Sequence, residues 1–256
     1  MNLSKANIGI VGANGTVGQI FCEHLQNVLP ISRAGIAKHE LYGLDAVIIC
    51  APSGVKFLAN NNPEEDYKSV CNLIELLNTL TGPRIILIST IDTLCHRFAN
   101  EYNGTPLTAY GLNRKFLESE TAKLGKTTIV RLGMLLSNKI KKNALYDLKH
   151  GVLDHQVHPD SEVQISNLYS AGLLISGLLN LSVEEINFFS EPIKWSSVQN
   201  LCTKLSLDDN KIGVTHEIKY NAKTSVDLKF KNISMSVGDM TGERMCLRRA
   251  KEYLNG

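Results

Sequence analysis

The stretch that decides the fold reads Ile8-Gly9-Ile10-Val11-Gly12-Ala13-Asn14-Gly15-Thr16-Val17-Gly18. Its apolar beginning predicts a buried strand, and the apolar spacing that follows predicts a helix, so the glycines lie in a strand–loop–helix unit. In such a unit Gly12 makes the tight turn, Gly15 lets a pyrophosphate approach the backbone, and Gly18 lets the helix pack on the strand. Free N–H groups at the helix N-terminus favour phosphate. The loop therefore predicts a bound dinucleotide, with contacts from Gly12, Asn14, Gly15, Thr16, Val17 and Gly18.

The first half of the chain alternates short apolar strands with amphipathic helices. Strands are expected at 8–11, 46–50, 84–89 and 128–132, with a weaker one at 31–36. Helices are expected from the glycine loop to Pro30, at 62–80 and at 109–124. Strict alternation implies right-handed crossovers and a parallel sheet covered on both faces. Residues 1–136 are thus predicted to form an α/β dinucleotide-binding domain with a Rossmann-type doubly wound parallel sheet.

The pattern changes after Leu136, and residues 137–256 are expected to form a smaller α+β substrate-binding region. It begins with a polar turn and a helix at 144–150, followed by a largely apolar helix at 168–179. A late strand at 186–189 is expected to join the main sheet, so the segment near 160–205 returns to the Rossmann core. Alternating apolar residues at 212–220 and 226–230 predict a hairpin.

Composition narrows the range of partners. The net charge of +2 provides no basic field that would indicate nucleic-acid binding. The sequence contains no run of 18 apolar residues, so no membrane span is predicted. No signal-peptide pattern precedes the first strand. The six cysteines lie far apart, which is typical of reduced thiols and predicts no metal site. We therefore expect a cytoplasmic protein whose partners are small molecules or other copies of the chain.

The choice of cofactor depends on the residues that follow the glycine loop. Enzymes that use NAD usually place Asp or Glu about 20 residues past this loop, where it binds the ribose hydroxyls. The corresponding stretch, 31–38, contains no acid but carries Arg33 and Lys38. These cations either meet a 2′-phosphate or are solvated surface charges. We expect NADP or NAD, with a preference for NADP and with Arg33 as a cofactor contact.

Two further motifs bear on chemistry. Ser89-Thr90-Ile91-Asp92 ends a predicted strand at the edge where open α/β sheets bind ligands. Tyr110 and Arg114 lie four residues apart and thus on one face of a predicted helix. Together with the glycine loop, these motifs resemble the extended short-chain dehydrogenase/reductase superfamily, and more narrowly its NAD-dependent epimerase/dehydratase family. The resemblance covers about residues 6–205 in order.

The resemblance implies a catalytic group of Tyr110, Thr90 and Arg114. In that family a tyrosine exchanges a proton with the substrate oxygen, a Ser or Thr holds that oxygen, and a lysine follows the tyrosine by four residues. A phenol needs a nearby cation to act as a base near neutral pH. Arg114 replaces the family's lysine and supplies permanent charge, but the lysine's relay of protons is lost. Lys115 is about 100° further round the helix and is a poor substitute. The other interpretation of Tyr110 is an ordinary core or surface tyrosine.

Other contacts are also implied by the resemblance. Cys50, Ala51 and Pro52 match the segment beside the nicotinamide, and Tyr110 and Arg114 also match cofactor contacts. Substrate contacts are implied for Thr90, Asp92 and Asn143. Asp92 is either an acid or a cap that stabilises the loop. Lys139, Lys141 and Lys142 either hold a substrate pyrophosphate or form a solvated turn.

The joint pattern predicts an NAD(P)-dependent oxidoreductase or epimerase that acts on a nucleotide-linked sugar or a similar polyhydroxylated substrate. Arg114 motivates an alternative, a non-catalytic NAD(P)-binding sensor or scaffold with a degenerate Tyr-x-x-x-Arg site. The compact C-terminal region leaves a third alternative open, a reductase of another small carbonyl compound. The resemblance also implies a homodimer that pairs through helices 62–80 and 109–124, whose apolar faces suit either the sheet or a partner.

Overall fold

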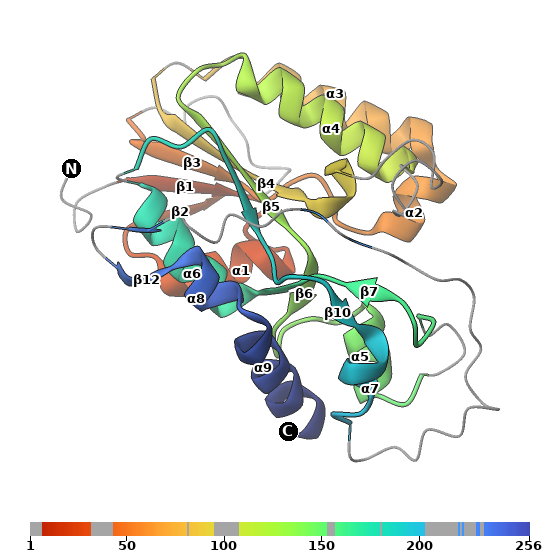
Figure 1. Ribbon diagram of the computed structural model, residues 1–256. Coiled ribbons are helices and arrows are strands. Elements are labelled where there is room, and N and C mark those ends of the chain that lie inside the picture. The colour runs from red at the N-terminus through yellow and green to blue at the C-terminus, as the bar shows by residue number, and fades with distance from the viewer. Residues whose placement is uncertain are drawn as a thin grey trace.

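A six-stranded parallel sheet forms the centre of the computed structural model (Figure 1). The structure describes residues 7–31, 43–80, 82–94, 108–152, 157–179, 181–202, 220, 222, 229–230 and 233–256. The strands, in spatial order, are β2 (Val28–Ile31), β1 (Ile8–Val11), β3 (Ala46–Ile49), β4 (Arg84–Thr90), β5 (Thr127–Leu132) and β9 (Glu185–Phe188). Every neighbouring pair is parallel. The predicted Rossmann-type sheet, including its late strand, is confirmed.

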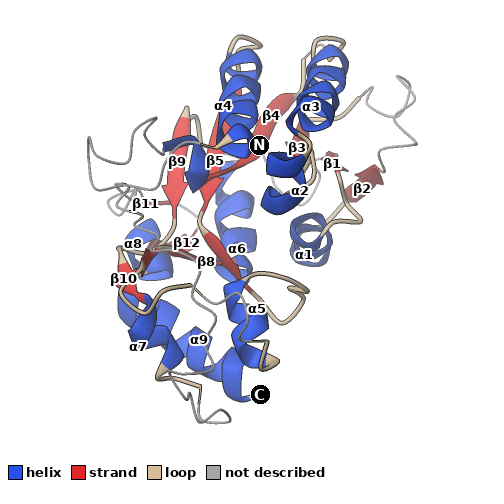
Figure 2. Ribbon diagram, turned by 90° about the vertical axis from the view of Figure 1, so that its right-hand side faces the viewer, coloured by secondary structure: helices blue, strands red, loops and turns tan. Residues whose placement is uncertain are grey.

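Helices cover both faces of the sheet. One face carries α2 (Lys56–Asn61), α3 (Pro63–Leu77) and α4 (Ala109–Ala122), and the other carries α1 (Thr16–His24) and α6 (Leu168–Leu178) (Figures 1 and 2). The strands β1 and β3 are buried throughout because both of their faces are covered. Burial of large apolar side chains from the strands and helices, each contributing roughly 1.5–3 kcal/mol, holds these layers together.

The helix α3 shows how the sequence specifies these elements. Pro63 occupies its first turn, and the acidic residues Glu64, Glu65 and Asp66 follow at the positive end of the helix dipole. Val70, Leu73 and Leu77 then recur at helical spacing and are the buried residues of this helix. The helices expected at 62–80 and 109–124 are therefore present, each shorter by two or three residues at its C-terminal end.

A second, smaller core surrounds Trp195. The elements that form it lie beside the sheet (Figure 2). Its elements are β6 (Met134–Leu136), α5 (Ala144–Lys149), β7 (Glu162–Val163), β8 (Ile165–Asn167), β10 (Ile193–Lys194), α7 (Trp195–Gln199) and α9 (Glu243–Asn255). Three further short elements lie near the C-terminus: β11 (Lys229–Phe230), β12 (Ile233–Ser236) and α8 (Val237–Thr241). The helices expected at 144–150 and 168–179 are confirmed as α5 and α6. No described helix has the length and apolar character that a bilayer span needs.

The structure corrects the boundaries around Pro30. The first helix ends at His24 rather than at the proline, and Asn27 adopts a φ of 54°. The second strand begins at Val28 and includes Pro30, whereas the expected strand at 31–36 lies outside the described residues after Ile31. Proline is tolerated here because the described sheet order places this strand at an edge, where no further strand needs the missing N–H.

The C-terminal region also differs from expectation. The helix α9 was not predicted, although its buried Cys246, Ala250 and Leu254 follow helical spacing. The expected hairpin of 212–220 and 226–230 lies outside the described residues apart from Tyr220 and β11. In the described part, β11 pairs antiparallel with β12.

Candidate active site

The glycine loop has the backbone that a phosphate cradle needs. Gly12 adopts a φ of 82°, and a Cβ there would lie 2.9 Å from the carbonyl oxygen of Cys50. A Cβ on Gly18 would lie 2.8 Å from the Cα of Ala13 and closer still to the carbonyl oxygen of Gly12. Gly15 is the N-cap of α1 and offers no side-chain cap. The first-turn N–H groups of α1 are therefore positioned for an anionic ligand.

The predicted nicotinamide segment and Thr90 lie at the same edge of the sheet as this loop. The strands β1, β3 and β4 are adjacent and parallel, so their carboxyl ends meet at one edge. The N–H of Cys50 donates to the carbonyl of Val11 at 2.8 Å, which holds residues 50–52 beside the loop. Thr90 ends the next strand.

Tyr110 is buried in the first turn of α4, at 8% exposure. Thr108 caps this helix by accepting from the N–H of Gly111, and the N–H of Tyr110 donates to Asn60 at 2.9 Å. Burial and the nearby Asp92 raise the pKa of Tyr110, while Arg114 and a hydrogen bond with Thr90 act in the opposite direction. The structure thus brings together the two residues of the predicted acid–base pair.

Arg114 is held in a buried ion pair with Asp66. Its two terminal nitrogens donate to the two carboxylate oxygens of Asp66 at 2.9 and 2.8 Å, and one also donates to the carbonyl of Ser53 at 2.8 Å. The guanidinium lies 4.5 Å from the ring centre of Tyr110. Burial would raise the pKa of Asp66, but hydrogen bonds from Arg114 and Asn113 outweigh it and lower that pKa. Arg114 therefore supplies charge beside Tyr110, while its hydrogen-bond donors are directed to Asp66 and Ser53.

Asp92 is the centre of a second polar cluster, in the short helix η3 (Ile91–Leu94). Its Oδ2 accepts from the Thr90 hydroxyl at 2.9 Å, and its N–H donates back to that oxygen at 3.2 Å. Its Oδ1 accepts from the Lys56 ammonium and from the Tyr220 hydroxyl, the latter at 2.8 Å. Lys56 also donates to the Tyr220 hydroxyl at 3.2 Å. The carboxylate of Asp92 thus joins Thr90 to two residues that the sequence analysis did not place in the site.

Tyr220 is positioned by backbone contacts with the smaller core. Its N–H donates to the carbonyl of Glu162 at 3.0 Å, next to β7. Gln164 exchanges two side-chain hydrogen bonds with the backbone of Ala222, each of 2.8 Å. Tyr220 and Ala222 are thereby aligned with residues 162–164. No sequence spacing relates Tyr220 to Asp92, and Lys56 is an isolated lysine at the start of α2, so neither carried a recognisable signal.

Asn143 caps α5 by accepting from the N–H of Tyr146 at 3.0 Å, and it donates to the carbonyl of Leu135 at 2.8 Å. Lys139 forms an ion pair with Glu23. Arg33 and Lys38 lie outside the described residues.

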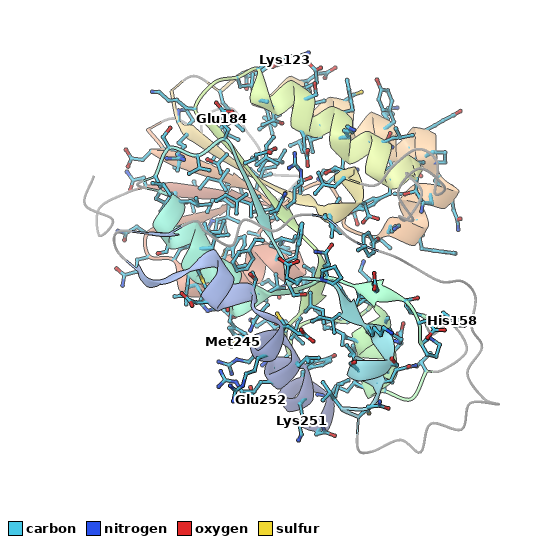
Figure 3. The ribbon with its side chains drawn as sticks, in the orientation of Figure 1. Lys123, His158, Glu184, Met245, Lys251 and Glu252 are labelled. Carbon is cyan, nitrogen blue, oxygen red and sulfur yellow. The ribbon has the colours of Figure 1, made fainter. Side chains whose placement is uncertain are left out.

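A metal centre finds no support in the described ranges. They hold no group of three or more His, Cys, Asp or Glu side chains that is suited to a metal ion. His158 lies at the outer side of the smaller core (Figure 3), where its Nδ1 is 3.8 Å from a carboxylate oxygen of Asp160.

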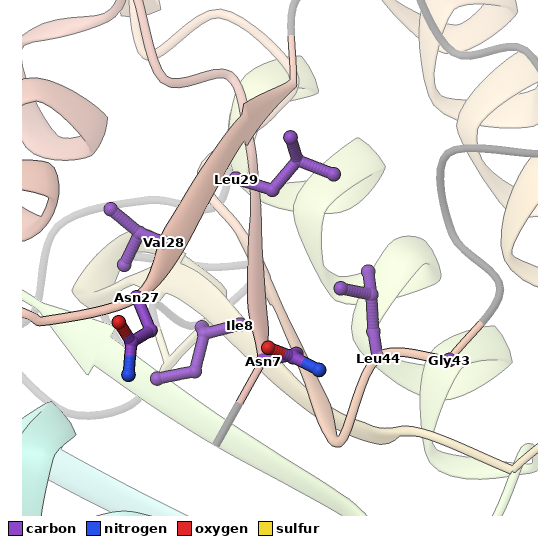
Figure 4. A pocket seen from close by; sticks show the side chains of 7 residues that line it. All are labelled: Asn7, Ile8, Asn27, Val28, Leu29, Gly43 and Leu44. Atoms are coloured by element: carbon purple, nitrogen blue, oxygen red, sulfur yellow. The ribbon is translucent and has the colours of Figure 1, made fainter. Parts of the chain in front are cut away.

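A pocket of about 420 Å³ lies at the opposite edge of the sheet (Figure 4). It is lined by residues at or before the amino ends of β1, β2 and β3: Asn7, Ile8, Asn27, Val28, Leu29, Gly43 and Leu44. Because ligands of open α/β sheets bind at the carboxyl ends of the strands, this pocket is separate from the candidate active site.

Solved structures with a similar architecture are numerous. RMD from Pseudomonas aeruginosa in complex with NADPH matches at 14% identity and a TM-score of 0.70, over 97% of this chain and 99% of that chain. A dTDP-4-dehydrorhamnose reductase from Clostridium acetobutylicum matches at 18% identity and a TM-score of 0.69, over 97% and 98%. MoeE5 in complex with UDP-glucuronic acid and NAD matches at 12% identity and a TM-score of 0.74, over 98% and 99%.

The chain shares its fold with these solved structures. The fold that the sequence resemblance implied is therefore confirmed, over nearly the whole length of these structures. No protein-family model matches the sequence, and neither does any curated protein.

Proposed function

We propose that the protein is an NAD(P)-dependent oxidoreductase or epimerase that acts on a nucleotide-linked sugar or a similar polyhydroxylated substrate. One observation carries the proposal: the glycine loop and the Tyr110–Thr90 pair lie at the same edge of one parallel sheet. Proteins with the same fold bind NADPH, or NAD together with UDP-glucuronic acid. This supports the choice of cofactor and substrate class.

The residues of the loop fit a dinucleotide. Gly12 and Gly18 allow the tight turn and the close helix packing that shape the loop, because a Cβ at either would collide with backbone atoms. The N-terminal turn of α1 offers N–H groups to a pyrophosphate. Cys50, Ala51 and Pro52 would line the nicotinamide side, and a nicotinamide bound there would supply hydride transfer. We propose NADP as the preferred form, on the basis of Arg33 and the absence of an acid at 31–38.

We assign the acid–base chemistry to Tyr110 and Thr90. Thr90 would hold the substrate oxygen by turning its hydroxyl, which donates to Asp92 in this structure, toward that oxygen. Tyr110 gives the same oxygen a proton or takes one from it. Burial raises the pKa of Tyr110, which keeps the phenol protonated and ready to act as an acid, while the Arg114 charge favours the phenolate that remains. Asp92 and Asn143 are the further substrate contacts that we propose, and Asn143 has one amide hydrogen left after its bond to Leu135.

Cofactor binding tests the first half of the proposal. Gly18→Ala places a Cβ against the Gly12 carbonyl. It should raise the Kd for NADPH and NADH at least about 10-fold, which is a loss of about 1.4 kcal/mol in binding free energy. Gly54→Ala is the matched control, because a Cβ at Gly54 meets nothing within 4 Å. Equal loss in both variants, or no binding by the wild type, would contradict the proposal.

Turnover tests the second half. Wild type and Tyr110→Phe are compared on a panel of nucleotide sugars, with product formation as the measurement. Phenylalanine keeps the ring but has no proton to exchange, so turnover should fall by about 100-fold or more. Equal turnover in both proteins would remove Tyr110 from the mechanism.

One observation favours a second candidate function, a non-catalytic NAD(P) sensor or scaffold. Arg114 stands in the position of the family's lysine and is bound to Asp66 and Ser53 rather than free to meet a ligand. Tight dinucleotide binding together with no turnover on any substrate of the panel would support the sensor.

We also propose a homodimer that pairs through α2, α3 and α4. Four of the exposed large apolar side chains lie on these helices: Phe57, Leu58, Tyr67 and Leu112. Their exposure on neighbouring helices is the feature that a partner would cover. Leu112→Arg should lower the mass in sedimentation equilibrium to that of one chain. Leu173→Arg, at an exposed leucine on α6, should leave the mass unchanged.

A further inference from the structure

We propose that Glu118 is a positioning residue that holds Thr90 in its place relative to Tyr110. This inference rests on the proposed function, in which those two residues carry the acid–base chemistry. Glu118 and Tyr110 both lie on α4. Ser89 directly precedes Thr90 and donates its hydroxyl to Glu118 Oε1 at 2.5 Å. Thr93 follows Thr90 by three residues and donates to the same oxygen at 3.0 Å. Two hydrogen bonds to one carboxylate thus attach the chain on both sides of Thr90 to the helix that carries Tyr110.

The hydroxyl of Thr93 links this attachment to Thr90 directly. It lies 3.0 Å from the carbonyl oxygen of Thr90 and also 3.0 Å from Glu118. A threonine hydroxyl has one proton, so the two acceptors share it. Thr93 is only 2% exposed, so these contacts are shielded from water. The position of the Thr90 backbone is therefore coupled to that of the Glu118 carboxylate.

Arg131 of β5 fixes the carboxylate itself. Its Nε donates to the two oxygens of Glu118 at 3.0 and 3.1 Å, and one terminal nitrogen donates to Oε2 at 2.8 Å. The other terminal nitrogen donates to Glu185 at 2.9 Å and to Asn187 at 3.2 Å, both on β9. The side chains of Arg131 and Glu118 are 9% and 7% exposed. Charge-assisted hydrogen bonds from a planar guanidinium hold a buried carboxylate in one orientation.

Thr90 and Tyr110 need such a support because they belong to different elements. Thr90 ends β4, whereas Tyr110 lies in the first turn of α4, so contacts between these elements set their relative position. Proton exchange with a substrate oxygen requires hydrogen-bond reach, about 2.6–3.2 Å between heavy atoms. The oxygens of Glu118 already accept hydrogen bonds from Ser89, Thr93 and Arg131. Glu118 therefore acts through Thr90 and not on the substrate.

Substitution of the two hydroxyl residues tests the attachment while the buried charges stay paired. Glu118→Ala is unsuited, because it would leave the buried Arg131 charge without its carboxylate and destabilise the fold. Ser89→Ala and Thr93→Val each remove one hydrogen bond to Glu118 and keep the ion pair. Thr121→Val is the matched control, because Thr121 is 1% exposed and its hydroxyl donates at 2.7 Å to a backbone carbonyl within α4.

The first measurement needs neither cofactor nor turnover. It is the carbon-13 resonance of the Tyr110 Cζ at pH 7, assigned by its absence in Tyr110→Phe. Thr90 is one of the groups that influence the pKa of Tyr110, so displacement of Thr90 changes the surroundings of this carbon. Ser89→Ala and Thr93→Val should each shift the resonance, whereas Thr121→Val should leave it at the wild-type position. A resonance that does not move in either site variant, or that moves as far in the control, overturns the inference.

Turnover provides a second readout, with a rescue. Thr93→Val should lower kcat by about 10-fold and the double variant Ser89→Ala/Thr93→Val by about 100-fold, since a misplacement of about 1 Å can cost this much. The Kd for NADPH should stay at the wild-type value, because neither residue lies in the glycine loop. Thr93→Ser keeps the hydroxyl and should retain the wild-type kcat. Equal kcat values in Thr93→Val and Thr93→Ser overturn the inference.

Failure of the proposed function is recognised separately. A wild type that neither binds NADPH nor turns over any substrate of the panel refutes the proposed function, and the carbon-13 resonance then decides alone whether Glu118 positions Thr90. An inactive Tyr110→Phe together with a wild-type kcat in Thr93→Val leaves the proposed function intact and refutes the positioning role.

Discussion

Two basic–acidic pairs flank Tyr110, and they differ in burial and in the chemistry of the cation. Arg114 and Asp66 are 5% and 9% exposed in their side chains and share two hydrogen bonds. Lys56 and Asp92 are 36% and 10% exposed, and their hydrogen bonds extend to Thr90 and Tyr220. The first pair is buried, and its cation, the Arg114 guanidinium, is permanently charged. We call it the closed pair. In the second pair, the open pair, the Lys56 amine is partly exposed to water and can be titrated. Of these two cations, Arg114 lies against the ring of Tyr110, whereas Lys56 bonds to Asp92 and Tyr220.

The largest effect is expected from breaking the closed pair. Asp66→Ala leaves the buried Arg114 guanidinium without its carboxylate and should lower the free energy of unfolding by about 3–5 kcal/mol. Urea unfolding at pH 7 measures this loss. Glu64→Ala, an exposed acidic residue in the same turn of α3, is the control and should change little.

The pH dependence of the same pair gives an independent check. The pKa of Asp66 is lowered in the folded state, so its contribution is fully present above the unfolded pKa of about 3.9. The contribution is lost as the pH falls toward the folded pKa. The difference in stability between the wild type and Asp66→Asn should therefore shrink below about pH 4. A difference that stays constant across this range would mean that the pair does not stabilise the fold.

A smaller effect is expected from Arg114→Lys. Lysine cannot reproduce the bidentate contact with Asp66, and the loss of charged hydrogen bonds should cost about 1.5–3 kcal/mol in the free energy of unfolding. Turnover should not rise, because Asp66 and Ser53 would still hold the cation at this position. A large gain in turnover would show instead that the protein is a weakened catalyst that lacks a lysine at 114.

The smallest effect on stability is expected at the open pair. Lys56→Met should change the free energy of unfolding by no more than about 1 kcal/mol, because a pair with a solvated partner gains little from its attraction. Thermal unfolding followed by circular dichroism measures it. A loss as large as that of Asp66→Ala would make Lys56 a structural residue and remove the contrast between the two pairs.

The sequence predicted most of the sheet because its signals are local. The apolar runs of β1, β3, β4 and β5 and the spacing of Val70, Leu73 and Leu77 in α3 depend only on neighbouring residues. The second strand was misplaced because Pro30 was interpreted as a helix stop, although a proline also fits an edge strand. The helix α9 was overlooked despite its amphipathic spacing.

By itself, the sequence determined the glycine loop and its relation to Thr90 and Tyr110. The loop follows from local sterics, since Gly12 and Gly18 must admit backbone atoms where a Cβ would collide. Thr90 and Tyr110 belong to motifs whose order along a doubly wound sheet brings them to one edge.

Only the tertiary structure decided which cation forms an ion pair with which carboxylate. Asp92 meets Lys56 across 36 positions of the chain and Tyr220 across 128. Arg114 meets Asp66 across 48 positions. Partners this far apart are chosen by the packing of α2, α3, α4 and the smaller core, and no residue spacing encodes them. For that reason the sequence predicted that a cation was needed beside Tyr110, whereas the packed structure showed that Arg114 fills this place while paired with Asp66, and that Lys56 pairs with Asp92.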